Sequence, residues 1–243
     1  MTNSKWQIKQ WGKAMVFTLL LLNSTLLSAR SFVADGDLLN AYLHNDMQVW
    51  KAHIDSMSNV QCPMSNHTLA YEYGYCAALM DKDKEAAKPY VQRFRQHVEA
   101  AKKTLPKGHY EMYMSAVYVY ELRLHESFHP VKSLDLAREA VKLAPNDPMT
   151  LTYCGTALFY APKPFGNKKE ALELFIKAEQ LFQGKQWYNC WWRPAAMMYI
   201  AQCYDKAGDT AEALRRAQYL LNQYPDYEYI RNDYMPALKR RAQ

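Results

Sequence analysis

The chain has 243 residues, of which 49% are hydrophobic and 22% are charged, and its formal net charge is +6. Four of the basic residues are Lys5, Lys9, Lys13 and Arg30, which lie in a leading segment without acidic residues, so 26 basic and 24 acidic residues remain beyond it. This nearly balanced remainder gives no electrostatic reason to expect a nucleic-acid partner. Its length suits a single elongated domain.

The N-terminal segment has the pattern of a secretory signal peptide. An apolar run from Met15 to Ala29 follows the three lysines, and it is shorter than the ~20 residues that span a bilayer. A small-x-small site ends at Ser31, so we expect residues 1–31 to be cleaved and residues 32–243 to form the mature domain. The chain would then be exported, periplasmic or secreted, without stable membrane insertion. An uncleaved anchor helix is the alternative.

Five cysteines in a chain expected to be exported raise the question of disulfides. Cys62 and Cys76 flank a loop of about 15 residues, whose closure is worth roughly 3 kcal/mol on the chain-entropy model, and this pairing stays open. Cys154 and Cys203 lie among apolar residues, where cysteine behaves as a small hydrophobe. No CxxC motif occurs, so neither a redox motif nor a thiolate zinc site is indicated, and we predict no cofactor.

Helical periodicity runs through the mature chain, and no segment alternates in the manner of a strand. The predicted fold class is therefore all-α. In chain order we expect one amphipathic helix from Asp37 to Met57, four helical hairpins at about 66–104, 108–145, 148–183 and 194–225, and a capping helix at 226–241.

Small residues recur within these hairpins. Gly74 and Ala86 lie twelve positions apart in the first hairpin, as do Ala201 and Ala213 in the last. A small residue on each helix lets the two axes approach closely. In the second and third hairpins the turns are four to five residues longer and contain HESFHPVK and APKPFGNKK. Insertions at equivalent places predict a shared edge of the fold, with Phe128 and Phe165 either exposed on it or tucked beneath it.

Residues 194–225, PAAMMYIAQCYDKAGDTAEALRRAQYLLNQYP, resemble one tetratricopeptide repeat (TPR). The break at Gly208-Asp209 separates its two helices, and Pro225 closes it. The chain resembles the TPR family over nearly all of its mature length, and the segment FGNKKEALELFIKAEQLF is similar to exported bacterial TPR proteins without an assigned activity. The resemblance implies a right-handed α-solenoid of about four hairpins with flanking N- and C-terminal helices. It supplies no catalytic residues.

The resemblance also implies where a partner would bind. TPR stacks bind extended peptides or partner helices along the concave face, which the first helix of each repeat lines. Carried over by position, that face presents Tyr71, Tyr75, Tyr113, Tyr120, Thr152, Thr156, Tyr160, Met198 and Gln202. Aromatic residues at helical spacing are also typical of a core, and this alternative stays open. The predicted function is non-catalytic binding of an unknown protein or peptide through this face and the edge with the long turns.

Three tryptophans, Trp187, Trp191 and Trp192, precede the last hairpin in QWYNCWWRP. So many rings in a short segment can form a stacking platform for a small ligand. They can equally fill an irregular junction between two repeats, which is the interpretation that we favour.

One enzymatic alternative rests on His125, Glu126 and His129, which spell HExxH. On a continuous helix the two histidines would ligate zinc and the glutamate would act as the general base of a zinc-dependent hydrolase. Pro130 disfavours helical geometry at His129, and the motif lies in a lengthened turn. We therefore predict no metal site here and regard the two histidines as weak candidates. A structural subunit that self-associates is a further alternative.

Overall fold

The computed structural model describes residues 35–58, 65–126 and 129–242, and residues 32–243 form one compact unit. The described residues contain eleven α-helices and no strand, so the predicted all-α class is confirmed. None of the helices in these ranges has the length and apolar character to cross a membrane. The predicted signal peptide, residues 1–31, lies outside the described residues.

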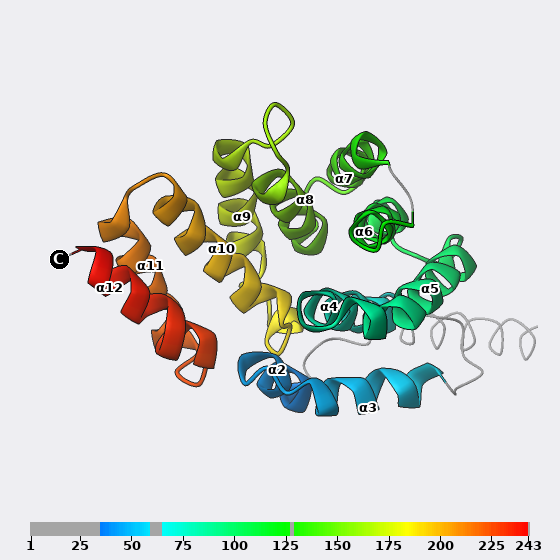
Figure 1. Cartoon of the computed structure of the whole chain (residues 1–243), viewed down its shortest axis with the longest axis horizontal. Coiled ribbons are helices and arrows are strands. Elements are labelled where there is room, and N and C mark those ends of the chain that lie inside the picture. Colours follow the sequence, from blue (N-terminus) through cyan, green and yellow to red (C-terminus); the bar gives the residue numbers. More distant parts are fainter. Residues whose placement is uncertain (1–34, 59–64, 127–128, 243) are drawn as a thin grey trace, which may run out of the picture. The chain divides into compact units, whose positions relative to one another are not determined.

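Figure 1 shows the helices in chain order. Their bounds are α2 (Gly36–Leu43), α3 (Met47–Ser58), α4 (Asn66–Lys82), α5 (Lys84–Ala101), α6 (His109–Arg123), α7 (Pro130–Leu143), α8 (Pro148–Tyr160), α9 (Lys168–Leu181), α10 (Trp192–Lys206), α11 (Thr210–Gln223) and α12 (Met235–Ala242). A 3-10 turn, η2 (Lys185–Trp187), precedes α10, and a π-helical turn, η3 (Tyr229–Tyr234), precedes α12.

The N-terminal helix predicted from Asp37 to Met57 is in fact two helices, α2 and α3. Asn45 between them has a φ of 53°, in the left-handed region that asparagine tolerates better than most residues. The Asp46 carboxylate then accepts hydrogen bonds from the backbone N–H groups of Gln48 and Val49, at 3.0 and 3.2 Å. The prediction of one helix is wrong because this local turn chemistry overrides the continuous apolar pattern.

From α4 to α11 the chain runs in four consecutive helix pairs. The first three pairs fall within the predicted hairpin segments, and the last begins two residues before its predicted segment, at Trp192. The helices pack as α4 on α5, α6 on α7, α8 on α9 and α10 on α11, and α5, α7 and α9 each also pack on the helix that follows (Figure 1). The shortest turn is Asp83 alone, whose side chain caps α5. Between α10 and α11, Gly208 has a φ of 86° and Asp209 caps α11.

Small residues lie where the helices of a pair come close. A Cβ atom on Gly155 of α8 would lie 2.8 Å from the ring of Phe175 of α9, so the ring packs directly on the α8 backbone. Ala171, which the sequence pairs with Gly155, is fully buried. Ala201 and Ala213 of the last pair are also fully buried. The predicted role of small residues in close helix packing is supported at these positions. It is wrong for the pair Gly74–Ala86, because Ala86 is exposed and Gly74 lies against Trp50 and Trp191 instead of α5.

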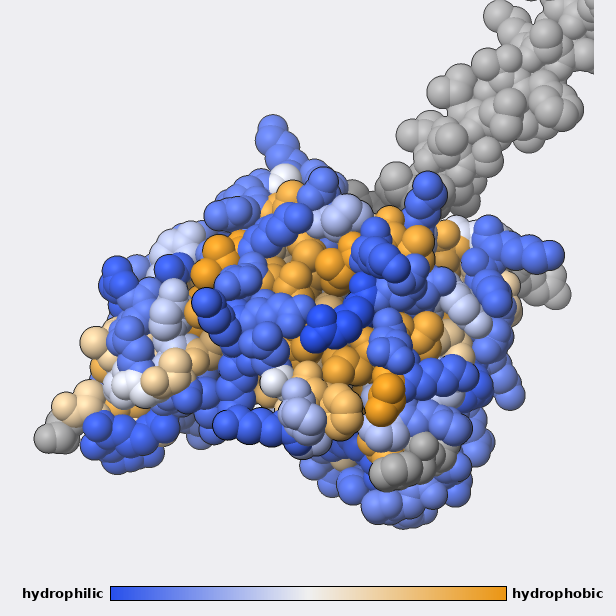
Figure 2. Space-filling view, turned by 90° about the horizontal axis from the view of Figure 1, so that it is seen from above, coloured by the Kyte–Doolittle hydropathy of each residue, from blue (hydrophilic) through white to orange (hydrophobic). Residues whose placement is uncertain are grey.

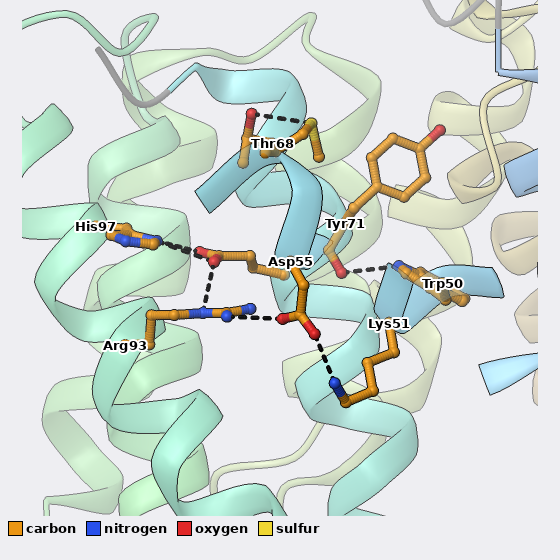
Figure 3. Close-up of polar contacts among 9 residues, drawn as sticks. Trp50, Lys51, Asp55, Thr68, Tyr71, Arg93 and His97 are labelled. Carbon is orange, nitrogen blue, oxygen red and sulfur yellow. Dashed lines mark hydrogen bonds and ion pairs between the residues drawn. The ribbon is translucent and has the colours of Figure 1, made fainter. Parts of the chain in front are cut away.

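A network of charged side chains around the buried Glu72 joins α3, α4 and α5 (Figure 3). Glu72 is 1% exposed, and its carboxylate lies 3.1 Å from Nε of Arg93 and 2.8 Å from Nδ1 of His97. Arg93 also pairs with Asp55 of α3 at 3.0 Å, and Lys51 pairs with the same carboxylate. Because a buried carboxylate is costly without such partners, this network fixes α3 against the first helix pair.

The C-terminal segment predicted as one helix at 226–241 also departs from regular geometry. It begins as the π-helical turn η3 and becomes α-helical only at Met235. Pro236 has no N–H to donate, so it cannot continue the hydrogen-bond pattern of a regular α-helix from the residues before it. Ile230, Tyr234 and Leu238 are buried, so the segment still covers the end of α11.

Candidate functional site

A partly open pocket of about 470 Å³ lies among α3, α4, α8, α10 and η3. Six of its lining residues form one continuous group of rings, which we call the aromatic cluster: Tyr42, Trp50, Tyr73, Trp191, Trp192 and Tyr227. These residues come from both ends of the described chain and from its middle. The pocket is therefore a product of the tertiary fold and not of any single helix pair.

The rings of the aromatic cluster are in direct contact. Tyr73 of α4 stacks on Trp192 with ring centroids 4.9 Å apart and an angle of 15°, and Trp191 lies 4.8 Å from Trp192. Trp191 also contacts Tyr42 at 5.3 Å and Trp50 at 5.5 Å. Ring contacts of this kind contribute about 0.5–1.5 kcal/mol each beyond the burial of their area, so they stabilise the wall of the pocket.

Gly74 gives the tryptophans access to the α4 backbone. A Cβ atom at this position would lie 2.5 Å from the Trp50 ring and 2.9 Å from the Trp191 ring. The Trp50 indole N–H donates a 3.0 Å hydrogen bond to the backbone carbonyl of Tyr71, which fixes its orientation (Figure 3). The floor of the pocket therefore consists of rings placed directly on a helix backbone.

A hydrogen bond between two tyrosines joins the two ends of the described chain at the pocket. The hydroxyl oxygens of Tyr42 and Tyr227 are 2.7 Å apart, although the residues are 185 positions apart. Burial, and then the neighbouring phenol, raise the pKa of Tyr42 well above its usual value, and burial likewise raises that of Tyr227. Both phenols are therefore neutral near pH 7, and the aromatic cluster itself carries no charge.

Three carboxylates, Asp81, Glu228 and Asp233, are the only ionisable groups in the pocket lining apart from tyrosines. Asp81 pairs with Arg123 at 2.6 Å. No described residue forms an ion pair with Glu228 or Asp233. No lysine, arginine or histidine lines the pocket within the described part of the chain, so its electrostatic character is acidic.

Three of the nine predicted groove residues line this pocket: Thr152 and Thr156 of α8 and Met198 of α10. The hydroxyls of both threonines donate to backbone carbonyls one turn earlier, at 2.7 and 2.9 Å. These two therefore offer mainly methyl groups to a ligand. Tyr160 is 65% exposed but lies outside the pocket lining, as does half-buried Gln202.

The other four predicted groove residues are in the core. Tyr71 and Tyr113 are fully buried, and Tyr75 and Tyr120 are 4% exposed. Their assignment to an open face is wrong, because their hydroxyls find partners inside the molecule. For example, Tyr71 donates to the Asp35 carboxylate at 2.8 Å, and Tyr120 donates to the carbonyl of Tyr73 at 2.9 Å. The alternative that helically spaced aromatics form the core holds for these residues.

The three tryptophans of QWYNCWWRP have different environments. Trp187 is half-buried in η2, and its ring lies edge-on to Phe182 at 5.5 Å. Trp191 and Trp192 are 6% and 2% exposed, so they pack largely as core residues, yet both line the pocket. The buried parts of Trp191 and Trp192 agree with a filled junction, which is the interpretation that we favour. The parts of the same rings that line the pocket leave the alternative of a ligand platform open.

The described residues of the HExxH segment, His125, Glu126 and His129, do not lie within a helix. Helix α6 ends at Arg123, His125 has a φ of 59°, and α7 begins at Pro130. Glu126 pairs with Lys88 at 2.9 Å, and the His129 ring packs 5.9 Å from the Tyr118 ring. The two histidines therefore do not face the same way on one helix, and no group of three His, Cys, Asp or Glu residues in the described ranges is arranged to hold a metal ion.

The cysteines that the structure describes are buried thiols: Cys76, Cys154, Cys190 and Cys203. Burial raises the pKa of Cys154 and of Cys203 to about 12, which makes both poor nucleophiles near pH 7. Cys62, the suggested partner of Cys76, lies outside the described residues.

Of the two phenylalanines in the long turns, Phe165 is 50% exposed, and Phe128 lies outside the described residues.

Most of the pocket lining was not predicted from the sequence. Tyr229 and Asp233 follow the last repeat-like unit, and Tyr42 and Trp50 precede the first, so no repeat register assigns them to a shared surface. The closely spaced Tyr227 and Tyr229 in DYEYI were the one available signal, because solvent-facing tyrosines are frequent at binding sites. The chain matches no protein-family model and no curated protein.

Proposed function

We propose that this protein is an exported, non-catalytic repeat protein of the TPR type that binds a peptide segment of a partner in its aromatic pocket. In this proposal residues 1–31 direct export to the periplasm or the exterior, and the helix pairs form a right-handed solenoid. The pocket lies on the concave side of that solenoid.

The arrangement of helices supports the TPR part of the proposal. Four consecutive helix pairs, with a small residue at the close contact of α8 with α9, fit a helical repeat, in which each pair packs mainly on its neighbours. The close approach of Phe175 to Gly155 and the turn at Gly208 both fit that pattern.

The observation that carries the binding proposal is the aromatic pocket. A concave pocket of about 470 Å³ with many aromatic side chains and a few polar groups has the size and composition typical of ligand sites. Tyr229 lines it with 42% of its surface exposed, so this ring is available to a partner. Figure 2 shows an area of hydrophobic residues bordered by hydrophilic ones on one face, a pattern typical of interaction surfaces.

Selection of binding peptides from a random heptapeptide display library, with residues 32–243 as bait, tests this function. The informative variant is Tyr229→Ala, which removes an exposed pocket ring with little effect on the core. Tyr219→Ala is the matched control, because Tyr219 is 41% exposed and lies outside the pocket lining.

We expect peptides that the wild type and Tyr219→Ala enrich and that Tyr229→Ala retains at least tenfold less well, as for a central aromatic contact. Enrichment of the same peptides by all three baits would show that the pocket is not the binding site. The absence of any enriched peptide would contradict the proposed function.

The same pocket gives some support to the second candidate, binding of a small ligand, since Trp191 and Trp192 line it. A thermal-shift screen with small aromatic and sugar ligands tests that candidate. Stabilisation of the wild type that is lost in Tyr229→Ala, together with no selected peptide, would favour it.

A further inference from the structure

The charged residues that line the aromatic pocket are all acidic. Glu228 directly follows Tyr227 of the aromatic cluster, and Asp233 lies in η3 on the same rim. Neither carboxylate has a basic partner in the described ranges, whereas Asp81 on α4 is partly neutralised by Arg123. The nearest basic residue in the chain, Arg231, donates to the side chain of Asn232 at 3.3 Å and does not line the pocket.

The remaining lining is suited to a cation as well. The faces of tyrosine and tryptophan rings are electron-rich, and they attract a cation that lies within about 6 Å of the ring centroid. Two tyrosine rings elsewhere in this chain already contact a cation. The Arg93 guanidinium lies 5.0 Å from the Tyr90 ring, and the Lys132 ammonium lies 4.5 Å from the Tyr118 ring. In the pocket, by contrast, no side chain of the described residues supplies the cation.

Resting on the proposed peptide-binding function, we propose that the pocket takes an arginine side chain of the bound peptide. The guanidinium group would lie on the exposed ring of Tyr229 and hydrogen-bond to the carboxylates of Glu228 and Asp233. The aliphatic part of the side chain would lie on apolar lining such as Met198 and Ala77.

Arginine fits this lining better than lysine does. Its planar guanidinium stacks on aromatic rings and donates in a fork that matches a carboxylate, and it is less strongly hydrated than an ammonium group. A lysine would meet the same charges but would lose more hydration and stack less well. An acidic or neutral side chain would leave Glu228 and Asp233 without a partner.

Four heptapeptide libraries with a fixed central residue test this inference. The central residue is arginine, lysine, citrulline or glutamate, and the six flanking positions are randomised over uncharged residues. Citrulline is the matched control, because it has nearly the shape of arginine without its charge. The baits are residues 32–243 as wild type, Glu228→Gln/Asp233→Asn, and Asp226→Asn as a control for loss of an exposed carboxylate outside the pocket lining.

We expect peptides from the arginine library to bind the wild type and Asp226→Asn roughly tenfold more tightly than their citrulline counterparts, with lysine in between. In Glu228→Gln/Asp233→Asn the arginine and citrulline peptides should bind about equally. Thermal unfolding of each bait confirms that the variants are folded.

The outcomes separate this inference from the proposed function. If citrulline or glutamate peptides bind the wild type as well as arginine peptides and lose affinity in Tyr229→Ala, the pocket binds peptides but does not select a cation, and the inference is wrong. If no library yields a peptide that depends on Tyr229, both the inference and the proposed function fail.

Discussion

At the scale of single residues, Gly155 determines how closely α8 and α9 pack. The Phe175 ring occupies the position where a larger side chain would begin, with only 2.8 Å to an added Cβ atom. We predict that Gly155→Leu lowers the free energy of unfolding by about 1–3 kcal/mol, as overpacking does. Urea denaturation measures the effect, and Gly36→Ala is the control because an added Cβ there meets only an ordinary contact at 3.7 Å. An unchanged stability of Gly155→Leu would show that the predicted repeat register is wrong.

Asp147 gives the molecule part of its pH dependence. Burial alone would raise the pKa of its carboxyl. The His109 ring, 3.2 Å away, and the N–H of Thr150, at 2.8 Å, lower the pKa by more than burial raises it, so the pKa lies below the usual value. In acid the folded state therefore binds fewer protons than the unfolded state. The ionised Asp147 carboxylate stabilises the fold above about pH 4, and this contribution is lost as the pH falls.

We predict that Asp147→Asn, which preserves the N-cap of α8, costs roughly 1–3 kcal/mol at pH 7 through the loss of the His109 interaction. The fall in stability between pH 5 and pH 2 should also become shallower than in the wild type. Urea denaturation across this pH range measures both effects, with Asp226→Asn as the control for an exposed carboxylate. Parallel curves for the wild type and Asp147→Asn would contradict the assigned role.

At the scale of helices, the break between α2 and α3 depends on the left-handed conformation of Asn45. We predict that Asn45→Ala destabilises the fold by about 1–2 kcal/mol, because alanine has no side chain that compensates for this conformation. Asn45→Gly should be tolerated nearly without loss, since glycine adopts it freely. Equal stability of the two variants would mean that the turn does not constrain the fold.

The helices were predictable to different degrees for physical reasons. The pairs from α4 to α11 each bury a periodic apolar side and end at recognisable punctuation such as Asp83, Gly208 and Pro145, so local sequence determines them. The segments outside the pairs were predicted less well. Asn45 and Pro236 change the backbone without interrupting the apolar pattern. Periodicity alone therefore predicts one continuous helix across each of these positions.

At the scale of the whole described unit, contacts between residues far apart in the chain create the pocket. Periodicity shows that Tyr71 and Tyr73 both lie on a helix, but tertiary contacts decide that Tyr71 is enclosed and that Tyr73 lines the pocket. The Tyr42–Tyr227 contact spans 185 positions and is invisible to any local pattern. This is why the fold class could be predicted and most of the pocket could not.

The same tyrosine pair yields a prediction about the unit as a whole. Tyr42→Phe removes the 2.7 Å hydrogen bond to Tyr227 and should cost about 0.5–1.5 kcal/mol. Amide hydrogen exchange should become faster in α2 and in residues 226–234, because this bond links the two. Tyr110→Phe, which removes an exposed bond to Glu99, is the control. Unchanged exchange in both segments would show that the pair does not hold the two ends together.

Photo-crosslinking shows whether a peptide binds in the aromatic pocket. A peptide selected on the wild type, with benzoylphenylalanine beside its central residue, is irradiated with residues 32–243, and the linked residues are located by mass spectrometry. We predict crosslinks to pocket residues such as Ala77, Met198 and Tyr229, with yields that fall in Tyr229→Ala and persist in Tyr219→Ala. Crosslinks confined to the turns at 124–129 and 161–167, or to any other surface outside the pocket, would contradict it.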